Sequence, residues 1–320
     1  MGVTLIFPGQ GSQYVGMGKS IDSLPLAQNV FNSANEACDF DLKSLMFEGP
    51  EDSLKLTENT QPAIVAHSVA LYEVLKEYLD KKQIKIDRVL GHSVGEYSAL
   101  VAAGSLDLKD AVKAVKNRGR FMQEAAPAGV GKMFAMLRIP AEIVAKACAE
   151  VSTQNEQVMP ANFNEPTQTV ISGHAKACDK AIKWIEENFE GRFRAMELSV
   201  SAPFHSTLMK PAEKNLELFL NNININENTV PYITNIDAKT NKAGTTPDVI
   251  KNSLIEQVCG SVLWSQSIAS LPSDTIFIEV GPGKVLKGLN KKINSDLRTY
   301  NLDCDEGLNG LEDFLNECNL

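Results

Sequence analysis

The sequence between residues 88 and 100 reads Arg88-Val89-Leu90-Gly91-His92-Ser93-Val94-Gly95-Glu96-Tyr97-Ser98-Ala99-Leu100. A short apolar run enters a Gly-x-Ser-x-Gly pentapeptide, and a segment with helical spacing of apolar residues leaves it. This order of strand, tight turn and helix is the pattern that exposes a serine nucleophile. The two glycines fit it, because side chains two residues either side of Ser93 would collide with the adjoining strand and helix. The pentapeptide also occurs in plain turns, so a structural turn remains the alternative.

Composition excludes several classes of function. The chain has 320 residues, 43% of them hydrophobic and 22% charged, with a net charge of −9. A sizeable core is therefore expected, and nucleic-acid binding, which needs a strongly basic face, is not. No apolar run approaches the ~20 residues of a membrane span. The first residues lack the basic start of a signal peptide and read as a strand, so we expect a cytoplasmic protein.

The six cysteines are Cys38, Cys148, Cys178, Cys259, Cys304 and Cys318. None forms a Cys-x-x-Cys pair or lies near a histidine at ligand spacing. We expect free thiols in a reducing compartment, with no metal site and no cofactor.

Strand-like and helix-like segments alternate in both outer parts of the chain. Helices are expected over 26–47, 57–78 and 108–125, and strands over 4–7, 230–235, 275–280 and 297–301. This alternation favours an α/β-hydrolase-like core with a mainly parallel, helix-covered sheet, formed by residues 1–130 and 198–320. Residues 131–197 show the order βαββαβ, which predicts an inserted ferredoxin-like subdomain.

A serine hydroxyl needs a base, and the chain has four histidines. His67 lies in an apolar helical segment and is expected to be a buried, hydrogen-bonded structural residue. His174 falls in the small subdomain, and the side chain of His92 should point away from its neighbour Ser93. His205, on a loop before a helix, is therefore the predicted base. No acidic residue stands out to orient it, so a backbone carbonyl is the expected partner.

Two backbone N–H groups are predicted to form an oxyanion hole. One belongs to Val94, directly after the nucleophile, and the other to Gln10, on the loop after the first strand. Two glycines flank Gln10, so the backbone can turn sharply there. A phosphate loop is disfavoured, since neither Gly-x-Gly-x-x-Gly nor a Walker lysine is present.

Gly119 is expected in the middle of a helix, where it costs about 0.8–1 kcal/mol relative to alanine. A close approach of another backbone or of a substrate would explain it.

Five motifs together resemble one known family in order and spacing. They are Phe7-Pro8-Gly9-Gln10-Gly11-Ser12-Gln13, Gly91-His92-Ser93-Val94-Gly95-Glu96-Tyr97, Arg118-Gly119-Arg120-Phe121-Met122-Gln123, Phe204-His205 followed by Leu208-Met209-Lys210-Pro211, and Glu279-Val280-Gly281-Pro282-Gly283. Across essentially the whole chain they are similar to the malonyl-CoA:acyl carrier protein transacylases of type II fatty acid synthesis.

The resemblance implies a ping-pong transfer of a malonyl group through Ser93, with His205 as base and an acyl carrier protein as acceptor. By the same match Arg118 pairs with the free malonyl carboxylate, and Met122 belongs to the same substrate-binding motif. Gln257 matches the position whose main-chain carbonyl orients the histidine. Asn162 matches a residue that lines the pocket from the small subdomain.

Two positions bear on specificity and on the fit to the family. Phe204 resembles the malonyl-selective form of its motif, and it would fill the space that an extra methyl group needs. The family usually has a proline before Trp264, where this chain has Ser261. That departure puts the contact between the Gln257 loop and His205 in question.

Three other functions remain open: a serine hydrolase or thioesterase, a carrier-protein-binding relative without turnover, and an acyltransferase of a polyketide pathway. A general esterase has no need of Arg118, and the intact Ser93 and His205 disfavour the binding-only relative. The family implies an acidic carrier protein as a transient partner and malonyl-CoA as substrate, and we expect a monomer. Lysines on or near one expected helix form the predicted docking patch, which consists of Lys284, Lys287, Lys291 and Lys292.

Overall fold

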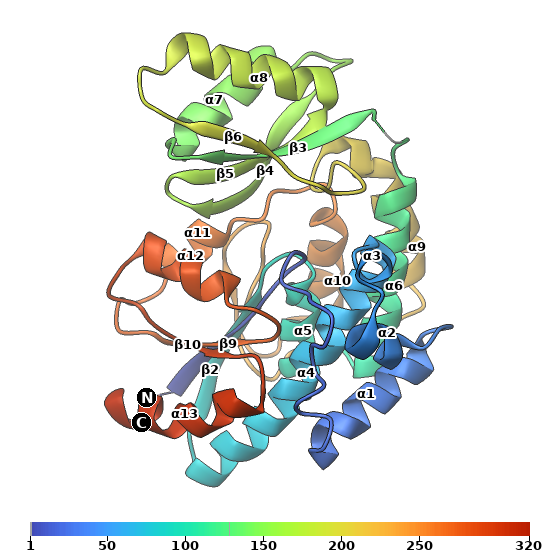
Figure 1. Cartoon of the computed structure of the whole chain (residues 1–320), viewed down its shortest axis with the longest axis vertical. Helices are drawn as coiled ribbons and strands as arrows, with labels where there is room; N and C mark the ends of the chain where they lie inside the picture. The colour runs from blue at the N-terminus through green and yellow to red at the C-terminus, as the bar shows by residue number, and fades with distance from the viewer. Residues whose placement is uncertain (1, 128) are drawn as a thin grey trace.

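A computed structural model describes residues 2–127 and 129–320, and it has two parts with separate sheets (Figure 1). The larger sheet has the strand order β10-β9-β1-β2-β7-β8. Its strands are β1 (Gly2–Phe7), β2 (Lys85–Gly91), β7 (Tyr232–Ile233), β8 (Thr240–Asn241), β9 (Ile276–Val280) and β10 (Arg298–Leu302). All neighbouring pairs are parallel except β7 and β8. The predicted mainly parallel α/β core is confirmed.

Helices cover both faces of this sheet. They are α1 (Pro25–Ala37), α2 (Leu42–Glu48), α3 (Glu51–Leu54), α4 (Thr57–Lys82), α5 (Gly95–Ala102), α6 (Leu108–Glu124), α9 (Lys210–Leu220) after the 3₁₀ turn η1 (Thr207–Met209), α10 (Pro247–Glu256), α11 (Trp264–Ala269), α12 (Val285–Ile293) and α13 (Asp305–Glu317). Alternate residues of β1 show the two faces: Leu5 joins the core with α4, and Ile6 joins a second core with α11 and α12.

The single helix predicted over residues 26–47 is wrong, because two helices lie there. Helix α1 ends at Cys38, whose backbone is extended. Asp41 then caps α2, its side chain accepting a hydrogen bond from the N–H of Ser44. An aspartate N-cap inside an apolar pattern was the signal for this break.

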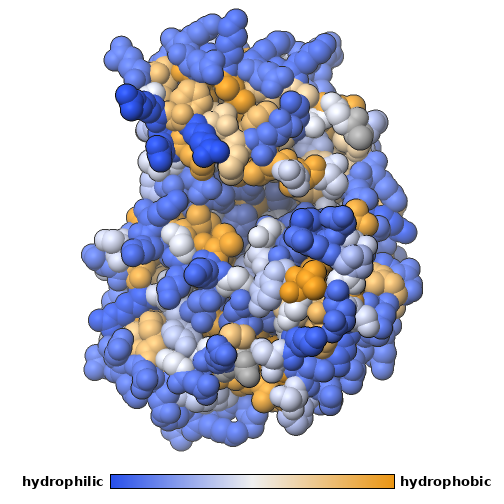
Figure 2. Space-filling view, in the orientation of Figure 1, coloured by the Kyte–Doolittle hydropathy of each residue, from blue (hydrophilic) through white to orange (hydrophobic). Residues whose placement is uncertain are grey.

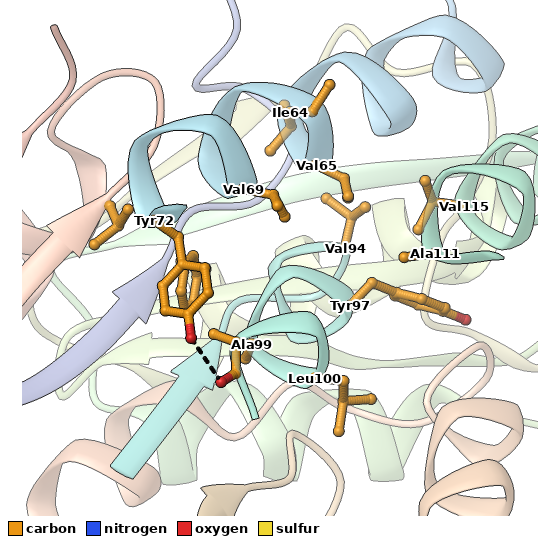
Figure 3. Close-up of a cluster of buried hydrophobic side chains, with 14 of the residues drawn as sticks. Ile64, Val65, Val69, Tyr72, Val94, Tyr97, Ala99, Leu100, Ala111 and Val115 are labelled. Atoms are coloured by element: carbon orange, nitrogen blue, oxygen red, sulfur yellow. Dashed lines mark hydrogen bonds between the residues drawn. The ribbon is translucent and has the colours of Figure 1, made fainter. Parts of the chain in front are cut away.

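The helix that follows the Gly-x-Ser-x-Gly turn, α5, is buried between α4 and α6 (Figure 3). Val65 and Val69 of α4 face Val94, and the hydroxyl of Tyr72 donates to the carbonyl of Ala102 at 3.1 Å. This packing on every side fixes the direction in which α5 leaves the turn.

The smaller part is the predicted βαββαβ insertion. It contains β3 (Gly131–Leu137), α7 (Ala141–Val151), β4 (Val158–Glu165), β5 (Gln168–His174), α8 (Ala175–Asn188) and β6 (Arg194–Glu197). The antiparallel order β4-β5-β3-β6 is that of a ferredoxin-like sheet, and both helices pack on it around a separate apolar core. The inserted ferredoxin-like subdomain is confirmed.

His67 is buried as predicted, but the predicted hydrogen bond is not made. Among the described residues neither ring nitrogen has a partner in ordinary hydrogen-bond geometry; the main chain of Asp303 is near enough to favour the protonated ring, and Nε2 lies 3.9 Å from Oδ1 of that residue. Burial lowers the pKa of His67 to about 4.

All six cysteines are free. Within residues 2–127 and 129–320, no helix has the length and apolar character needed to cross a membrane.

Candidate active site

Ser93 lies on a turn that only small neighbours permit. Its φ angle is +50°, in the left-handed region that non-glycine residues rarely adopt. A Cβ atom on Gly91 would lie 2.0 Å from the backbone of Gly95, and one on Gly95 would lie 2.2 Å from the carbonyl oxygen of Phe7. Strand β2 and helix α5 can therefore meet at Ser93 only because Gly91 and Gly95 lack side chains.

Ser93 and His205 are brought together from positions 112 residues apart. The Oγ atom of Ser93 is 2.8 Å from Nε2 of His205. The Nδ1 atom of His205 lies 2.9 Å from the carbonyl oxygen of Gln257 and 3.1 Å from that of Gly260. Carbonyls only accept, so Nδ1 carries the proton and Nε2 is free to accept the proton of Ser93.

The surroundings of His205 keep its ring neutral. Burial first, and then the nearby positive charge of Arg118, lower the pKa of His205 to about 3. His92 does not compete for Ser93, since its Nε2 lies 2.9 Å from Oδ1 of Asn164. His174 lies in the small subdomain, where its Nδ1 accepts from the N–H of Gln157 at 3.0 Å.

Arg118 is a buried cation, 1% exposed, that projects from α6 to the serine. Its Nη1 donates to Oε1 of Gln61 at 2.8 Å, and its Nη2 donates to Oε1 of Gln257 at 2.8 Å and to Oγ of Ser93 at 3.1 Å. Its Nε is buried without a partner, and no carboxylate among the described residues lies within 4 Å of the guanidinium. A buried cation with no carboxylate in direct contact is suited to an anionic ligand.

Gly119 allows α6 to bring Arg118 this close. A Cβ atom there would lie 2.6 Å from the carbonyl oxygen of Thr57 and 2.8 Å from Cα of Glu58, at the start of α4. The close approach expected at Gly119 is therefore that of a backbone.

Both parts of the molecule line one cavity of about 110 Å³ beside Ser93. Figure 2 shows the surface hollowed between the small subdomain at the top and the large part below it. The cavity is lined by Gln10, Gln61, His92, Ser93, Arg118, Met122, Met133, Asn162, Leu198, Val200, Phe204 and His205. The predicted residues thus line the same cavity as Ser93; they are Gln10, Met122, Asn162 and Phe204. Gln257 does not line this cavity and instead contacts Arg118 and His205.

The predicted oxyanion donors have no competing partner. Neither the N–H of Gln10 nor that of Val94 donates a hydrogen bond within the described part of the chain. Their role stays a prediction. The side chain of Gln10 donates to Oγ1 of Thr57 at 3.3 Å, which fastens its loop to α4.

Ser261 is compatible with the contact between the Gln257 loop and His205, which the departure from the family's proline had put in question. Its hydroxyl donates to the carbonyl oxygen of Pro160 in β4 at 2.7 Å. The next residue, Val262, pairs with the same strand through its N–H and its carbonyl. The loop that supplies the carbonyls of Gln257 and Gly260 is therefore fastened to the small subdomain.

Three polar residues of the site escaped the sequence analysis: Asn235, Glu96 and Gln61. Asn235 accepts from the N–H of Ser93 at 2.7 Å and donates to the carbonyl of Gly91 at 2.6 Å, so one amide spans the turn. Glu96 is 1% exposed, and burial raises its pKa to about 7. Only the position of Glu96, three residues after Ser93, was a usable signal, since the other two come from distant segments.

Comparisons with known proteins agree with this arrangement. Residues 4–300 match the family model described as acyl transferase domain. The malonyl CoA-acyl carrier protein transacylase of Bacillus subtilis is 46% identical over 302 residues, covering 93% of this chain and 92% of the relative. The Escherichia coli protein of that name is 42% identical over 291 residues, covering 90% and 91%.

Solved structures give the same result. The crystal structure of the malonyl CoA-acyl carrier protein transacylase of Clostridium perfringens has a TM-score of 0.90 at 38% identity, covering 99% of this chain and 98% of that one. A type II PKS acyl-carrier protein in complex with its malonyl-transacylase also matches, with a TM-score of 0.90 at 36% identity over 98% of this chain and 100% of that one. The chain belongs to the acyl transferase family, among the malonyl CoA-acyl carrier protein transacylases.

Proposed function

We propose that this chain transfers a malonyl group from malonyl-CoA to the phosphopantetheine thiol of an acyl carrier protein, through a malonyl ester on Ser93. One observation carries the choice of substrate. Arg118 is a buried cation without a carboxylate partner among the described residues, and it donates to the Oγ atom that would carry the acyl group. A malonyl group attached to Ser93 would therefore place its free carboxylate beside the guanidinium of Arg118.

In the first half-reaction, Ser93 Oγ attacks the thioester carbonyl of malonyl-CoA while its proton passes to Nε2 of His205. The N–H groups of Val94 and Gln10 stabilise the resulting oxyanion. The C–S bond then breaks, and His205 returns the proton to the leaving sulfur of coenzyme A. In the second half-reaction the carrier thiol attacks the malonyl ester, and the same proton path restores Ser93.

The guanidinium supplies selectivity for the malonyl group over an acetyl group. A planar guanidinium can bind a carboxylate through two parallel hydrogen bonds. A hydrogen bond to a charged group contributes about 1.5–3 kcal/mol, which corresponds to a preference of about 10- to 150-fold. Phe204 lines the cavity, and its bulk would disfavour a branched methylmalonyl unit.

The proposal includes the setting of the reaction. The chemistry needs no metal or other cofactor, since Ser93 itself carries the acyl group. We propose a monomeric cytoplasmic enzyme of fatty acid synthesis, which meets carrier proteins transiently and binds no nucleic acid. The polyketide carrier in the matching complex makes a polyketide pathway the second candidate setting for the same chemistry.

Intact-mass spectrometry after mixing with malonyl-CoA tests the proposal, with Ser93→Ala and Arg118→Ala beside the wild type. We expect a malonyl adduct on the wild type, no adduct on Ser93→Ala, and a smaller difference between malonyl-CoA and acetyl-CoA for Arg118→Ala. Addition of an acyl carrier protein should remove the adduct from the enzyme and transfer it to the carrier. Hydrolysis of malonyl-CoA without transfer would replace the proposal with a thioesterase.

A further inference from the structure

Gln257 contacts the two groups that the proposed reaction requires, one through its side chain and the other through its main chain. Its Oε1 accepts from Arg118, and its main-chain carbonyl accepts from His205. Its Nε2 donates to Oε2 of Glu96 at 2.7 Å, to the carbonyl oxygen of Ser93 at 3.1 Å and to Oδ1 of Asn235 at 3.4 Å. Gln257, a single buried residue, therefore contacts Arg118, the base His205 and the backbone of the nucleophile Ser93.

The side-chain amide of Gln257 has two ends, and only one orientation serves this site. If the amide were flipped, its NH₂ group would face the guanidinium of Arg118, donor against donor. Its oxygen would then face the acceptor oxygens of Glu96 and Ser93. The buried carboxyl of Glu96 makes the shortest of the three contacts to the NH₂ end, so it favours the same orientation as Arg118 does at the oxygen end.

Glu96 also anchors the residue that spans the nucleophile turn. Its Oε2 accepts from the main-chain N–H of Asn235 at 3.2 Å, and the Asn235 side chain in turn contacts Ser93 and Gly91. The other carboxyl oxygen, Oε1, is buried with no partner in the described part of the chain, and no cation lies within 4 Å. A buried carboxyl is costly, and what offsets the cost here is the two N–H donors to Oε2 and the more distant charge of Arg118, not a direct ion pair.

We propose that Glu96 is a positioning residue for substrate selection, because it orients the Gln257 amide so that Arg118 is held above Ser93. Glu96 touches neither the serine hydroxyl nor the cavity, and it acts through Gln257. The inference rests on the proposed function, since it concerns the carboxylate that Arg118 would bind.

The test compares Glu96→Met with Glu96→Gln in single-turnover acylation of Ser93 by malonyl-CoA and by acetyl-CoA, followed by intact mass. Methionine keeps the length of the side chain but offers no acceptor to Gln257. Glutamine keeps an acceptor oxygen at the position of Oε2. We expect the ratio of malonyl to acetyl rates to fall at least about tenfold in Glu96→Met, the loss of one hydrogen bond to a charged group. Glu96→Gln should restore the ratio to within about threefold of the wild type.

A merely structural role would lower both acylation rates in proportion and leave the ratio unchanged, and that result would overturn the inference. If Glu96→Met does not fold, Gln257→Met takes its place, since it removes the amide but keeps the carbonyl that faces His205. An unchanged ratio in Gln257→Met would equally reject the idea. The wild type separates the two proposals: without a malonyl preference in the wild type, the proposed function fails first.

Discussion

At the scale of single residues, the site depends on backbone conformations that side chains rarely adopt. Ser93 and His205 have φ angles of +50° and +55°, and both carry a side chain in the left-handed region. Such positions cost of order 1–3 kcal/mol each and persist only where the surroundings determine them. Around Ser93 these surroundings are the two glycines and the amide of Asn235.

A methyl group on Gly91 should therefore be severely destabilising. Its position, 2.0 Å from the backbone of Gly95, leaves no room, and we expect Gly91→Ala to lower the free energy of unfolding by about 3 kcal/mol or more. Gly288→Ala is the matched control, since no atom lies within 4 Å of that position in α12. There alanine should raise stability by up to about 1 kcal/mol. Urea unfolding of both variants checks the pair, and a Gly91→Ala protein as stable as the wild type would contradict the geometry.

The pKa of His205 predicts an unusual pH dependence of acylation. Protonated His205 cannot accept the serine proton, so the rate falls when pH drops through the pKa of the ring. Because that pKa is lowered to about 3, the rate at pH 5 should remain close to that at pH 7. A histidine with the ordinary pKa of 6.5 would lose more than about 90% of its rate over that range.

Rapid-quench measurement of Ser93 acylation from pH 4 to pH 8 provides the check. The Glu96→Gln variant serves as the control, because Glu96 is the nearby carboxyl whose pKa burial raises to about 7. A midpoint near pH 6.5 in both proteins would show that His205 titrates as an ordinary histidine.

At the scale of elements, α12 lies at the border between the two parts of the molecule. It packs against β4 of the small subdomain, and Gly283, just before it, approaches Ser12 on the loop that carries Gln10. Lys284, Lys287, Lys291 and Lys292 are all exposed, as is Val285. The lysines predicted to form a patch thus share one short helix region at the border of the two parts (Figure 1).

Charge reversal on α12 should separate the two half-reactions. We expect Lys291→Glu with Lys292→Glu to slow transfer to an acidic carrier protein about tenfold at low salt, while acylation by malonyl-CoA stays unchanged. Lys81→Glu with Lys82→Glu, an exposed pair at the end of α4, is the matched control. Separate rate measurements of acylation by malonyl-CoA and of transfer to the carrier protein provide the check. Equal loss in both half-reactions, or equal effects of the two pairs, would exclude α12 as the docking element.

At the scale of the whole molecule, two parts with separate sheets form one cavity, and the loop before α11 is one of the segments that join them, here called the seam. The loop that orients His205 pairs with β4 through Val262, and the hydroxyl of Ser261 adds a bond to Pro160. We expect Ser261→Ala to lower stability by about 0.5–1.5 kcal/mol and to speed hydrogen exchange in β4. Ser270→Ala, which removes a bond of the same 2.7 Å length within one helix end, should leave exchange in β4 unchanged. Unaltered exchange in Ser261→Ala would show that the seam does not depend on this serine.

The sequence analysis could predict much of this molecule because much of it depends on local pattern. The spacing of apolar residues predicted the strands of the two sheets, and the pattern of Gly91, Ser93 and Gly95 predicted the turn. The break between α1 and α2 was missed, since the apolar pattern continues across Asp41. Asn235 and Gln61 were not predictable from the residues alone, because an amide has no signature until the fold brings it against Ser93 or Arg118.

The six free cysteines have a consequence for how such an enzyme would withstand oxidation. It would handle two thiol carriers, coenzyme A and a pantetheine arm, yet no cysteine is among the described residues that line its cavity. Burial raises the pKa of Cys38 to about 11 and that of Cys148, Cys178 and Cys259 to about 12, so these sulfurs stay protonated and unreactive. A disulfide of coenzyme A would therefore find no thiolate to exchange with beside Ser93. Because the nucleophile is a serine, the acyl-transfer step uses no protein thiol that could form a disulfide with coenzyme A or the pantetheine arm.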